Sequence, residues 1–180
     1  MRPISFSLLL LLAACAQGEG EGETLLVIAP GSEWDDPVYA EGKATFTTVQ
    51  AAIDAAVSGD TVAIAAGTYT ENITMKSGVN VDGAGQGQSY LVGTVTFAGA
   101  ASGTTLSGFT LVDPTWSATR SRYTNHGVTV TSGYAILDDV GAYYYNYAVY
   151  ANAASGVILS DVTLGYNWYG VVSYDSGLIT

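Results

Sequence analysis

The chain has little of the chemistry that usually marks an active site. Its 180 residues include one cysteine and one histidine, and 5 basic residues stand against 16 acidic ones, for a net charge of −11. A single cysteine excludes a disulfide framework within the chain, so packing must stabilise the fold. The acidic balance argues against partners such as nucleic acid or an anionic lipid surface, because both require clustered positive charge.

No apolar run is long enough for a transmembrane helix, which needs about 20 residues. The first apolar run follows the single charge of Arg2, extends from Ile4 to Leu12 and ends in LAAC at Cys15. This pattern is typical of an export signal, and its end resembles the bacterial lipobox. The resemblance implies cleavage before Cys15 and a lipid on its sulfur. Ala16, where Asp would favour inner-membrane retention, indicates anchoring to the outer membrane or cell surface, facing periplasm or exterior. Ordinary secretion is the alternative.

Three segments follow from composition. Residues 1–14 are predicted to be a lipoprotein signal peptide, and residues 15–23 a lipidated cysteine with a flexible acidic tether, because AQGEGEGE cannot bury apolar surface. Residues 24–180 form one domain. The whole chain is 48% hydrophobic and 12% charged, which is typical of a folded protein with a real core.

The domain is predicted to be all-β. Short runs of β-forming residues alternate with turn residues, and helical spacing is nearly absent. The dipeptide Ser-Gly recurs at Ser77, Ser102, Ser132, Ser155 and Ser176, in steps of 25, 30, 23 and 21 residues. A period near 22 suits one coil of a solenoid with about three short strands per coil, and the chain has room for about six coils.

Residues 47–57 are the exception, because their apolar positions have helical spacing. Thr47 or Thr48 is the predicted N-cap and Gly59 the residue after the C-cap. A solenoid needs an atypical terminal unit to cover its apolar end, so we expect this helix to cap the first coil. The alternative is the crossover helix of a βαβ unit in a doubly wound sheet.

These residues also carry a family resemblance. The run TFTTVQAAIDAAVSGDTVAIAAGTYTENITM, followed by GVNVDGAG, resembles the N-terminal signature of right-handed parallel β-helix proteins of the pectin-lyase-like superfamily. The resemblance covers about residues 24–85 and implies the fold. It says little about activity, because the superfamily contains lyases, hydrolases, esterases and non-enzymatic surface proteins. The Gln-Asp element of pectin methylesterases and the aspartate-plus-base pattern of pectate lyases are not recognisable, so a catalytic role is less favoured than binding.

Three groups of residues could carry chemistry. Asp139 and Asp161 align in the repeats, with Asp138 beside the first. Adjacent coils would bring their carboxylates close together, where Ca²⁺ is a suitable guest. The alternative is that they are solvated turn residues.

A second group lies in an insertion at residues 112–127. It holds Trp116, Arg120, Arg122, Tyr123 and His126, where aromatic rings could stack on sugars and the two arginines could clamp a uronate carboxylate. The alternative is a polar surface loop without a ligand.

The third group is an aromatic belt at residues 143–150 and 166–174. A 21-residue register places Tyr147 on Trp168, and likewise Tyr145 on Tyr166 and Asn146 on Asn167. The rings form a carbohydrate-binding face if they point outward and a core if they point inward.

The sequence therefore favours a lipid-anchored protein that binds polysaccharide. The alternatives are a polysaccharide lyase or hydrolase of which this is an N-terminal part, and a structural or adhesive spacer. The sequence stops in mid-repeat at SGLIT, so we expect a partner or further coils to cover the last coil.

Overall fold

The computed structural model describes residues 22–27, 45–117 and 124–180. These residues are mostly β, with one helix. In chain order the elements are β1 (Thr24–Val27), β2 (Thr45–Phe46), α1 (Val49–Ala55), β3 (Thr61–Ile64), β4 (Gly67–Tyr69), β5 (Ile73–Met75), β6 (Asn80–Gly83), β7 (Ser89–Val92), β8 (Val95–Ala100), β9 (Thr105–Val112), β10 (His126–Tyr143), β11 (Tyr147–Asn152), β12 (Gly156–Ser160), β13 (Thr163–Gly165), β14 (Tyr169–Tyr174) and β15 (Leu178–Ile179).

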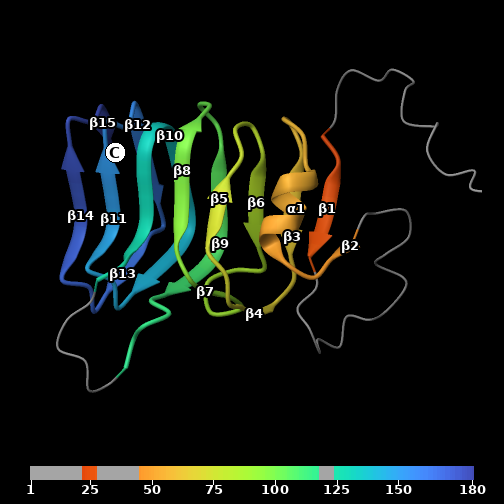
Figure 1. The fold of residues 1–180 in the computed structure, drawn as a ribbon, viewed down its shortest axis with the longest axis horizontal. Helices are drawn as coiled ribbons and strands as arrows, with labels where there is room; N and C mark the ends of the chain where they lie inside the picture. The colour runs from red at the N-terminus through yellow and green to blue at the C-terminus, as the bar shows by residue number, and fades with distance from the viewer. Residues whose placement is uncertain (1–21, 28–44, 118–123) are drawn as a thin grey trace, which may run out of the picture.

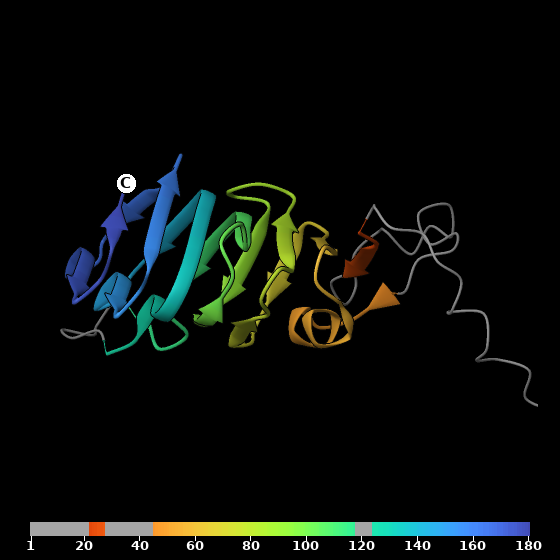
Figure 2. The same ribbon diagram turned by 90° about the horizontal axis from the view of Figure 1, so that it is seen from above.

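Every strand pair in the described part of the chain is parallel, and the pairs form three strips. Strip 1 contains β1 with its neighbour β2, β3, β6, the start of β9, the middle of β10, β12 and β15. Strip 2 contains β4, β7, the end of β9, the end of β10 and β13. Strip 3 contains β5, β8, the start of β10, β11 and β14. From β3 onward the chain visits strips 1, 2 and 3 in that order. The sheet is therefore curled into a half-barrel, with its strands lying across the long axis of the molecule (Figures 1 and 2).

The repeat length predicted from the sequence is found in several of the pairs. Tyr134 pairs with Gly156, and Gly156 pairs with Leu178, so each step is 22 residues. The step from β9 to β10 is longer, since Thr105 pairs with Ile136, 31 residues away. The extra length falls between the end of β9 at Val112 and the start of β10 at His126, where the sequence predicted an insertion.

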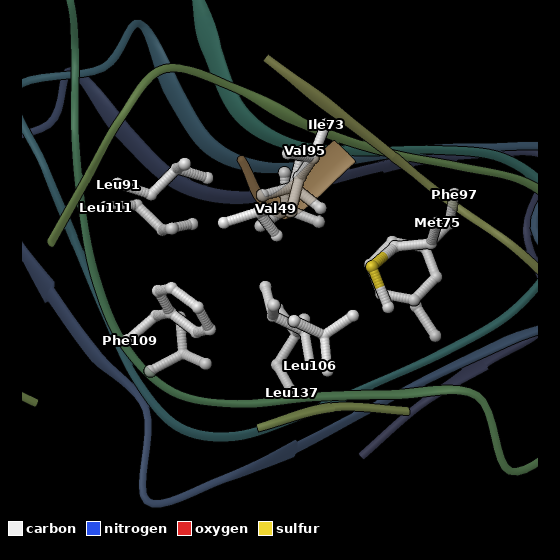
Figure 3. Close-up of a cluster of buried hydrophobic side chains, with 14 of the residues drawn as sticks. Val49, Ile73, Met75, Leu91, Val95, Phe97, Leu106, Phe109, Leu111 and Leu137 are labelled. Atoms are coloured by element: carbon white, nitrogen blue, oxygen red, sulfur yellow. The ribbon is translucent and has the colours of Figure 1, made fainter. Parts of the chain in front are cut away.

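The core lies inside the curl and is built from columns of matched residues. In strip 3, Val95 pairs with Val128, and Val128 with Val149; all three are fully buried. Figure 3 shows side chains from all three strips, Leu91 and Leu106 among them, meeting in this interior. Full burial of a Val or Leu side chain stabilises a fold by roughly 1.5–3 kcal/mol. The column ends in Val171, which is 38% exposed.

Helix α1 lies beside β5 at the N-terminal end of strip 3 (Figure 1) and buries Val49, Ala52 and Ile53 against the core. It is shorter than the predicted 47–57. Thr48 is the N-cap, and the helix ends at Ala56, where Asp60 Oδ2 accepts a hydrogen bond from Val57 N. The prediction that Gly59 follows the C-cap is therefore wrong. Gly59 lies in the turn after the helix and has a φ of 103°. Strands β1 and β3 pair in parallel across this helix, as in a βαβ unit, but the described elements that follow α1 are all strands.

The residues of the β-helix-like signature hold this helix in place. Thr48 Oγ1 accepts a bond from Ala51 N, and the carboxylate of Glu71 accepts bonds from Val49 N at 2.9 Å and Gln50 N at 3.0 Å. These contacts satisfy the amides of Val49, Gln50 and Ala51, which have no backbone partner within the helix, and Ala52 N makes the first helical bond, to Thr48 O.

The other end of the helix is held in the same way. The Lys76 ammonium donates to the carbonyls of Asp54 and Ala56, where a cation also interacts favourably with the helix dipole. Glu23, predicted to end the flexible tether, is bound to the domain, because its amide donates to Asp60 Oδ1 at 2.9 Å. The signature residues thus have structural roles that account for their spacing.

Candidate functional site: an aromatic groove on strip 2

A groove runs over the outer face of strip 2 and has a cavity volume of about 470 Å³. Its walls are aromatic and come from separate strands and the turns beside them. The lining residues are Gln86, Gly87, Tyr90, Thr110, Val112, Tyr143, Tyr144 and Tyr166. The strip places them together because Tyr90 pairs with Thr110, and Val112 with Tyr143. Outward and inward residues alternate here, and the inward neighbours Leu91 and Leu111 are fully buried.

The Tyr143 ring lies over glycines of two paired strands, Gly141 of β10 and Gly165 of β13. A Cβ atom on Gly165 would stand 2.6 Å from Cε1 of the Tyr143 ring, and one on Gly141 would stand 2.8 Å from its Cε2. Only glycine leaves room for the ring at these two positions, since real Cβ contacts do not come closer than about 3.0 Å. The half-buried ring is therefore supported from below by the sheet and forms a platform in the groove.

Three further rings form a stack at the edge of the groove. Trp116 lies 4.7 Å from Tyr144, and Tyr144 lies 5.4 Å from Tyr166 in a stacked arrangement, both measured between ring centroids. Tyr144 and Tyr166 have φ values of 69° and 56°, a left-handed conformation that is costly for a bulky residue. Tyr166 is 75% exposed, so burial does not explain a tyrosine at this strained corner.

A buried carboxylate holds the base of the insertion that carries Trp116. Asp113 Oδ1 accepts hydrogen bonds from Thr115 N and Thr115 Oγ1, both at 2.6 Å, and from Asn125 Nδ2 at 2.9 Å. Asp113 O also accepts a bond from Trp116 N. These contacts close the two ends of the insertion together and bring the Trp116 ring against Tyr144. Asp113 Oδ2 is buried without a hydrogen-bond partner among the described residues.

Gln86 connects the groove to two later segments of the chain, at Asp139 and Asp161. Its Nε2 donates to Asp139 Oδ1 at 3.1 Å and to the Asp161 carbonyl at 3.0 Å, and its backbone N donates to Asp139 Oδ2 at 3.2 Å. A Cβ atom on Gly141 would lie 2.9 Å from Gln86 Oε1, so this oxygen lies beside the Tyr143 platform. Within the described chain, Oε1 accepts no hydrogen bond.

A second aromatic group lies on strip 3. His126 is 4.8 Å from Tyr147 and 4.6 Å from Tyr150, and Tyr147 is 5.1 Å from Tyr169. Burial lowers the pKa of His126 below its ordinary 6.5, so the imidazole is neutral at pH 7. The ring distances place the predicted site residues His126 and Tyr147 in direct contact.

Trp116 belongs to the groove group, whereas Trp168 is 49% exposed and its backbone N donates to the Tyr145 carbonyl at 3.1 Å. The predicted insertion residues Trp116 and His126 thus contact different rings, Tyr144 and Tyr147.

The predicted register of the aromatic belt is wrong by one residue. Tyr147 pairs with Tyr169 rather than with Trp168. Tyr144, rather than Tyr145, stacks on Tyr166, and the Asn167 side chain bonds Tyr145 N rather than meeting Asn146.

The error has a physical cause. Ala154 N donates to Ser176 Oγ, 22 residues away, so the Ser-Gly dipeptides at residues 155 and 176 are not equivalent positions. The pairing register is set by the residues that face the core. A 21-residue step would pair buried Val149 with Gly170, and the inward and outward side chains of the strand would exchange places. Matching the inward-facing residues Val149 and Val171, which are 22 residues apart, would have predicted the true register from the sequence.

Tyr145, expected to be part of the belt, belongs to the core. It is fully buried, and its hydroxyl donates to the Gly93 carbonyl at 2.5 Å. Burial, together with the nearby Asp113 carboxylate, raises the pKa of Tyr145 far above its ordinary 10.0, so the hydroxyl keeps its proton and remains a donor.

The aspartates predicted to bind Ca²⁺ occupy the expected places. Asp138 pairs with Ser160, and Asp139 and Asp161 lie one position further on, each with a φ of 49°. Both oxygens of the Asp139 carboxylate accept bonds from Gln86. Among the described residues, no three Asp, Glu, His or Cys side chains are grouped so that they could hold a metal ion. Asp139 is therefore a turn residue whose carboxylate is hydrogen-bonded to Gln86, and the Ca²⁺ site remains a prediction.

Four predicted site residues lie outside the described residues: Cys15, Arg120, Arg122 and Tyr123. So do residues 1–14 and most of the tether. Within the described ranges, no helix has the length and apolar character needed to cross a membrane. Sequence reasoning missed Gln86 and Tyr90, because their partners Asp139 and Thr110 lie on later strands and no local pattern marks them.

Comparisons of the chain with protein-family models, curated proteins and solved structures found no match. The class defined by the structure itself is an all-β protein with a parallel sheet curled into a half-barrel, compatible with a β-helix-like fold.

Proposed function

We propose that the curled sheet is a right-handed parallel β-helix of about six coils, of the pectin-lyase-like type, and that it binds polysaccharide. The recurring order of the three strips, the 22-residue steps and the structural roles of Thr48, Glu71 and Asp60 support the fold. The LAAC motif supports a lipid anchor at Cys15, which would place the domain outside the cytoplasm.

The observation that carries the binding function is the Tyr143 platform. A pyranose ring has an apolar face of C–H bonds and a rim of hydroxyls, so it matches a flat aromatic ring surrounded by polar atoms. The groove offers both, with Gln86 Oε1 beside the platform and rings on either side. Because successive strands of a sheet are about 4.8 Å apart, side chains on neighbouring coils could contact the same or adjacent sugar units along a chain.

The chemistry of the groove is that of a binding site. A concave, mostly apolar surface with a few polar groups is the usual form of a ligand site. Both oxygens of the Asp139 carboxylate accept bonds from Gln86, so that carboxylate is not placed as a free general base. We therefore place binding ahead of catalysis.

The test is affinity electrophoresis of the detergent-solubilised full chain in gels containing polysaccharide, followed by calorimetry with any polymer that retards it. Tyr143→Ala should abolish retardation. Gly165→Ala should weaken it as well, because a methyl group displaces the ring without removing it. Tyr134→Ala is the matched control, since Tyr134 is an exposed tyrosine on strip 1, outside the groove.

Two outcomes would contradict the proposal. One is that no polymer in a broad panel retards the wild-type protein. The other is that Tyr134→Ala abolishes retardation as completely as Tyr143→Ala. The lipid anchor is tested separately: labelled palmitate should be incorporated into the wild-type chain and not into Cys15→Ser.

A further inference from the structure

The polar atoms beside the Tyr143 platform restrict the kind of sugar that the groove can take. Both N–H groups of the Gln86 amide are already used, one on Asp139 Oδ1 and one on the Asp161 carbonyl. The amide therefore presents only its oxygen, Oε1, toward the ring of Tyr143. An oxygen of this kind accepts hydrogen bonds from hydroxyl groups and donates none.

Negative charge lies directly behind this oxygen. The Asp139 carboxylate is within hydrogen-bond distance of the Gln86 side chain, and Asp161 occupies the equivalent position on the next coil. Among the described residues, no Lys or Arg lines the groove. The described Lys76 is occupied at the end of helix α1. The chain as a whole carries a net charge of −11.

We infer that the groove is selective for uncharged sugar residues and discriminates against uronates and other carboxylated sugars. This inference rests on the proposed polysaccharide binding and specifies its substrate class. A neutral sugar can lie on Tyr143 and donate a hydroxyl to Gln86 Oε1. A uronate in the same pose places its carboxylate against an acceptor oxygen, with the Asp139 charge behind it, and finds no donor on the Gln86 side chain. The inference departs from the uronate clamp expected from Arg120 and Arg122.

The experiment uses pairs of polymers that share a backbone and differ in whether their substituents are charged. Hydroxyethyl cellulose is compared with carboxymethyl cellulose, and dextran with carboxymethyl dextran, so that two backbones are covered. Dissociation constants for the full chain are measured at low and at high salt. We expect the carboxylated polymer of the recognised backbone to bind at least about tenfold more weakly at low salt, which corresponds to about 1.4 kcal/mol of repulsion. Added salt should narrow the difference, because it screens the charges.

Two variants connect this discrimination to the charge behind Gln86. Asp139→Asn removes one charge while keeping a residue that tolerates the left-handed conformation, and the ratio of the two dissociation constants should fall several-fold. The Asn amide turns an NH₂ group toward one of the two Gln86 donors, so affinity for the neutral polymer should fall as well, and the discrimination is therefore measured as the ratio within this variant. Asp161→Asn is the matched control at the equivalent position. Its carboxylate makes no contact with the Gln86 side chain among the described residues, so the effect should be smaller.

The outcomes separate the inference from the function on which it rests. If the carboxylated polymers bind more tightly than the neutral ones, and lose that affinity in Arg120→Gln or Arg122→Gln, the inference is overturned and polysaccharide binding stands. If discrimination is unchanged in Asp139→Asn, the proposed cause is wrong. If no polymer of either charge binds, the proposed function itself fails.

Discussion

Removing the Glu71 carboxylate should destabilise the protein by about 3 kcal/mol, although Glu71 lies 22 residues from the helix that it caps. Its two oxygens accept bonds from Val49 N at 2.9 Å and from Gln50 N at 3.0 Å. A hydrogen bond to a charged group contributes roughly 1.5–3 kcal/mol, and the half-buried position of Glu71 favours the lower end of that range. Two such bonds therefore contribute about 3 kcal/mol.

The variants Glu71→Ala and Glu71→Gln separate the contributions of the two hydrogen bonds to the free energy of unfolding. Alanine removes both acceptors and leaves the amide of fully buried Val49 without a partner. Glutamine keeps one oxygen but turns an NH₂ group toward the second amide, so we expect about half the loss or somewhat more. Glu23→Ala, at an exposed side chain, is the control for the change of charge.

The assay is urea unfolding of the full chain followed by circular dichroism, combined with amide hydrogen exchange. The Val49 and Gln50 amides should lose protection in Glu71→Ala before the core strands do, because the short helix depends on its caps. A stability within about 0.5 kcal/mol of wild type, with both amides still protected, would refute the reasoning, since capping losses of this kind are larger. Glu71 would then have to be explained by something other than its contacts with the helix.

Three further predictions concern the aromatic residues. Tyr145→Phe should cost about 1–2 kcal/mol in urea unfolding, since the Gly93 carbonyl loses its buried donor; unchanged stability would show that this bond contributes nothing. The His126 imidazole should titrate below pH 6.5 by NMR and move back toward 6.5 in Tyr147→Ala; a midpoint above 6.5 would mean that cation–π attraction outweighs burial. Because His126 binds a proton more readily when unfolded, its contribution to stability should be complete above pH 6.5 and should decline as the pH falls below that value. Tyr166→Asn should change stability by no more than about 1 kcal/mol, because relief of the strained φ offsets the lost stack, yet it should weaken polysaccharide binding; a loss above 2 kcal/mol would contradict this balance.

The amino-acid sequence alone determined the class of the fold and the place of its helix. Alternating apolar residues with Gly and Ser between them can form only short strands, and their recurrence near 22 residues places those strands side by side. Thr48 and the Gly-Thr-Tyr-Thr-Glu run ending at Glu71 lie close enough in sequence for their pattern to indicate a capped helix beside a strand. For the strand repeat and the capped helix, the local sequence pattern and the tertiary structure agree.

The site depended on tertiary structure. Gln86 meets Asp139 across 53 residues, and Gly165 makes room for the ring of Tyr143, its partner on the neighbouring strand. Such contacts exist only after the strands pair in register, and a shift of one residue would exchange the inner and outer faces of a strand. Short repeated dipeptides did not determine that register. It was decided by the buried columns, because burial of Val149 contributes more free energy than any turn residue at the corners.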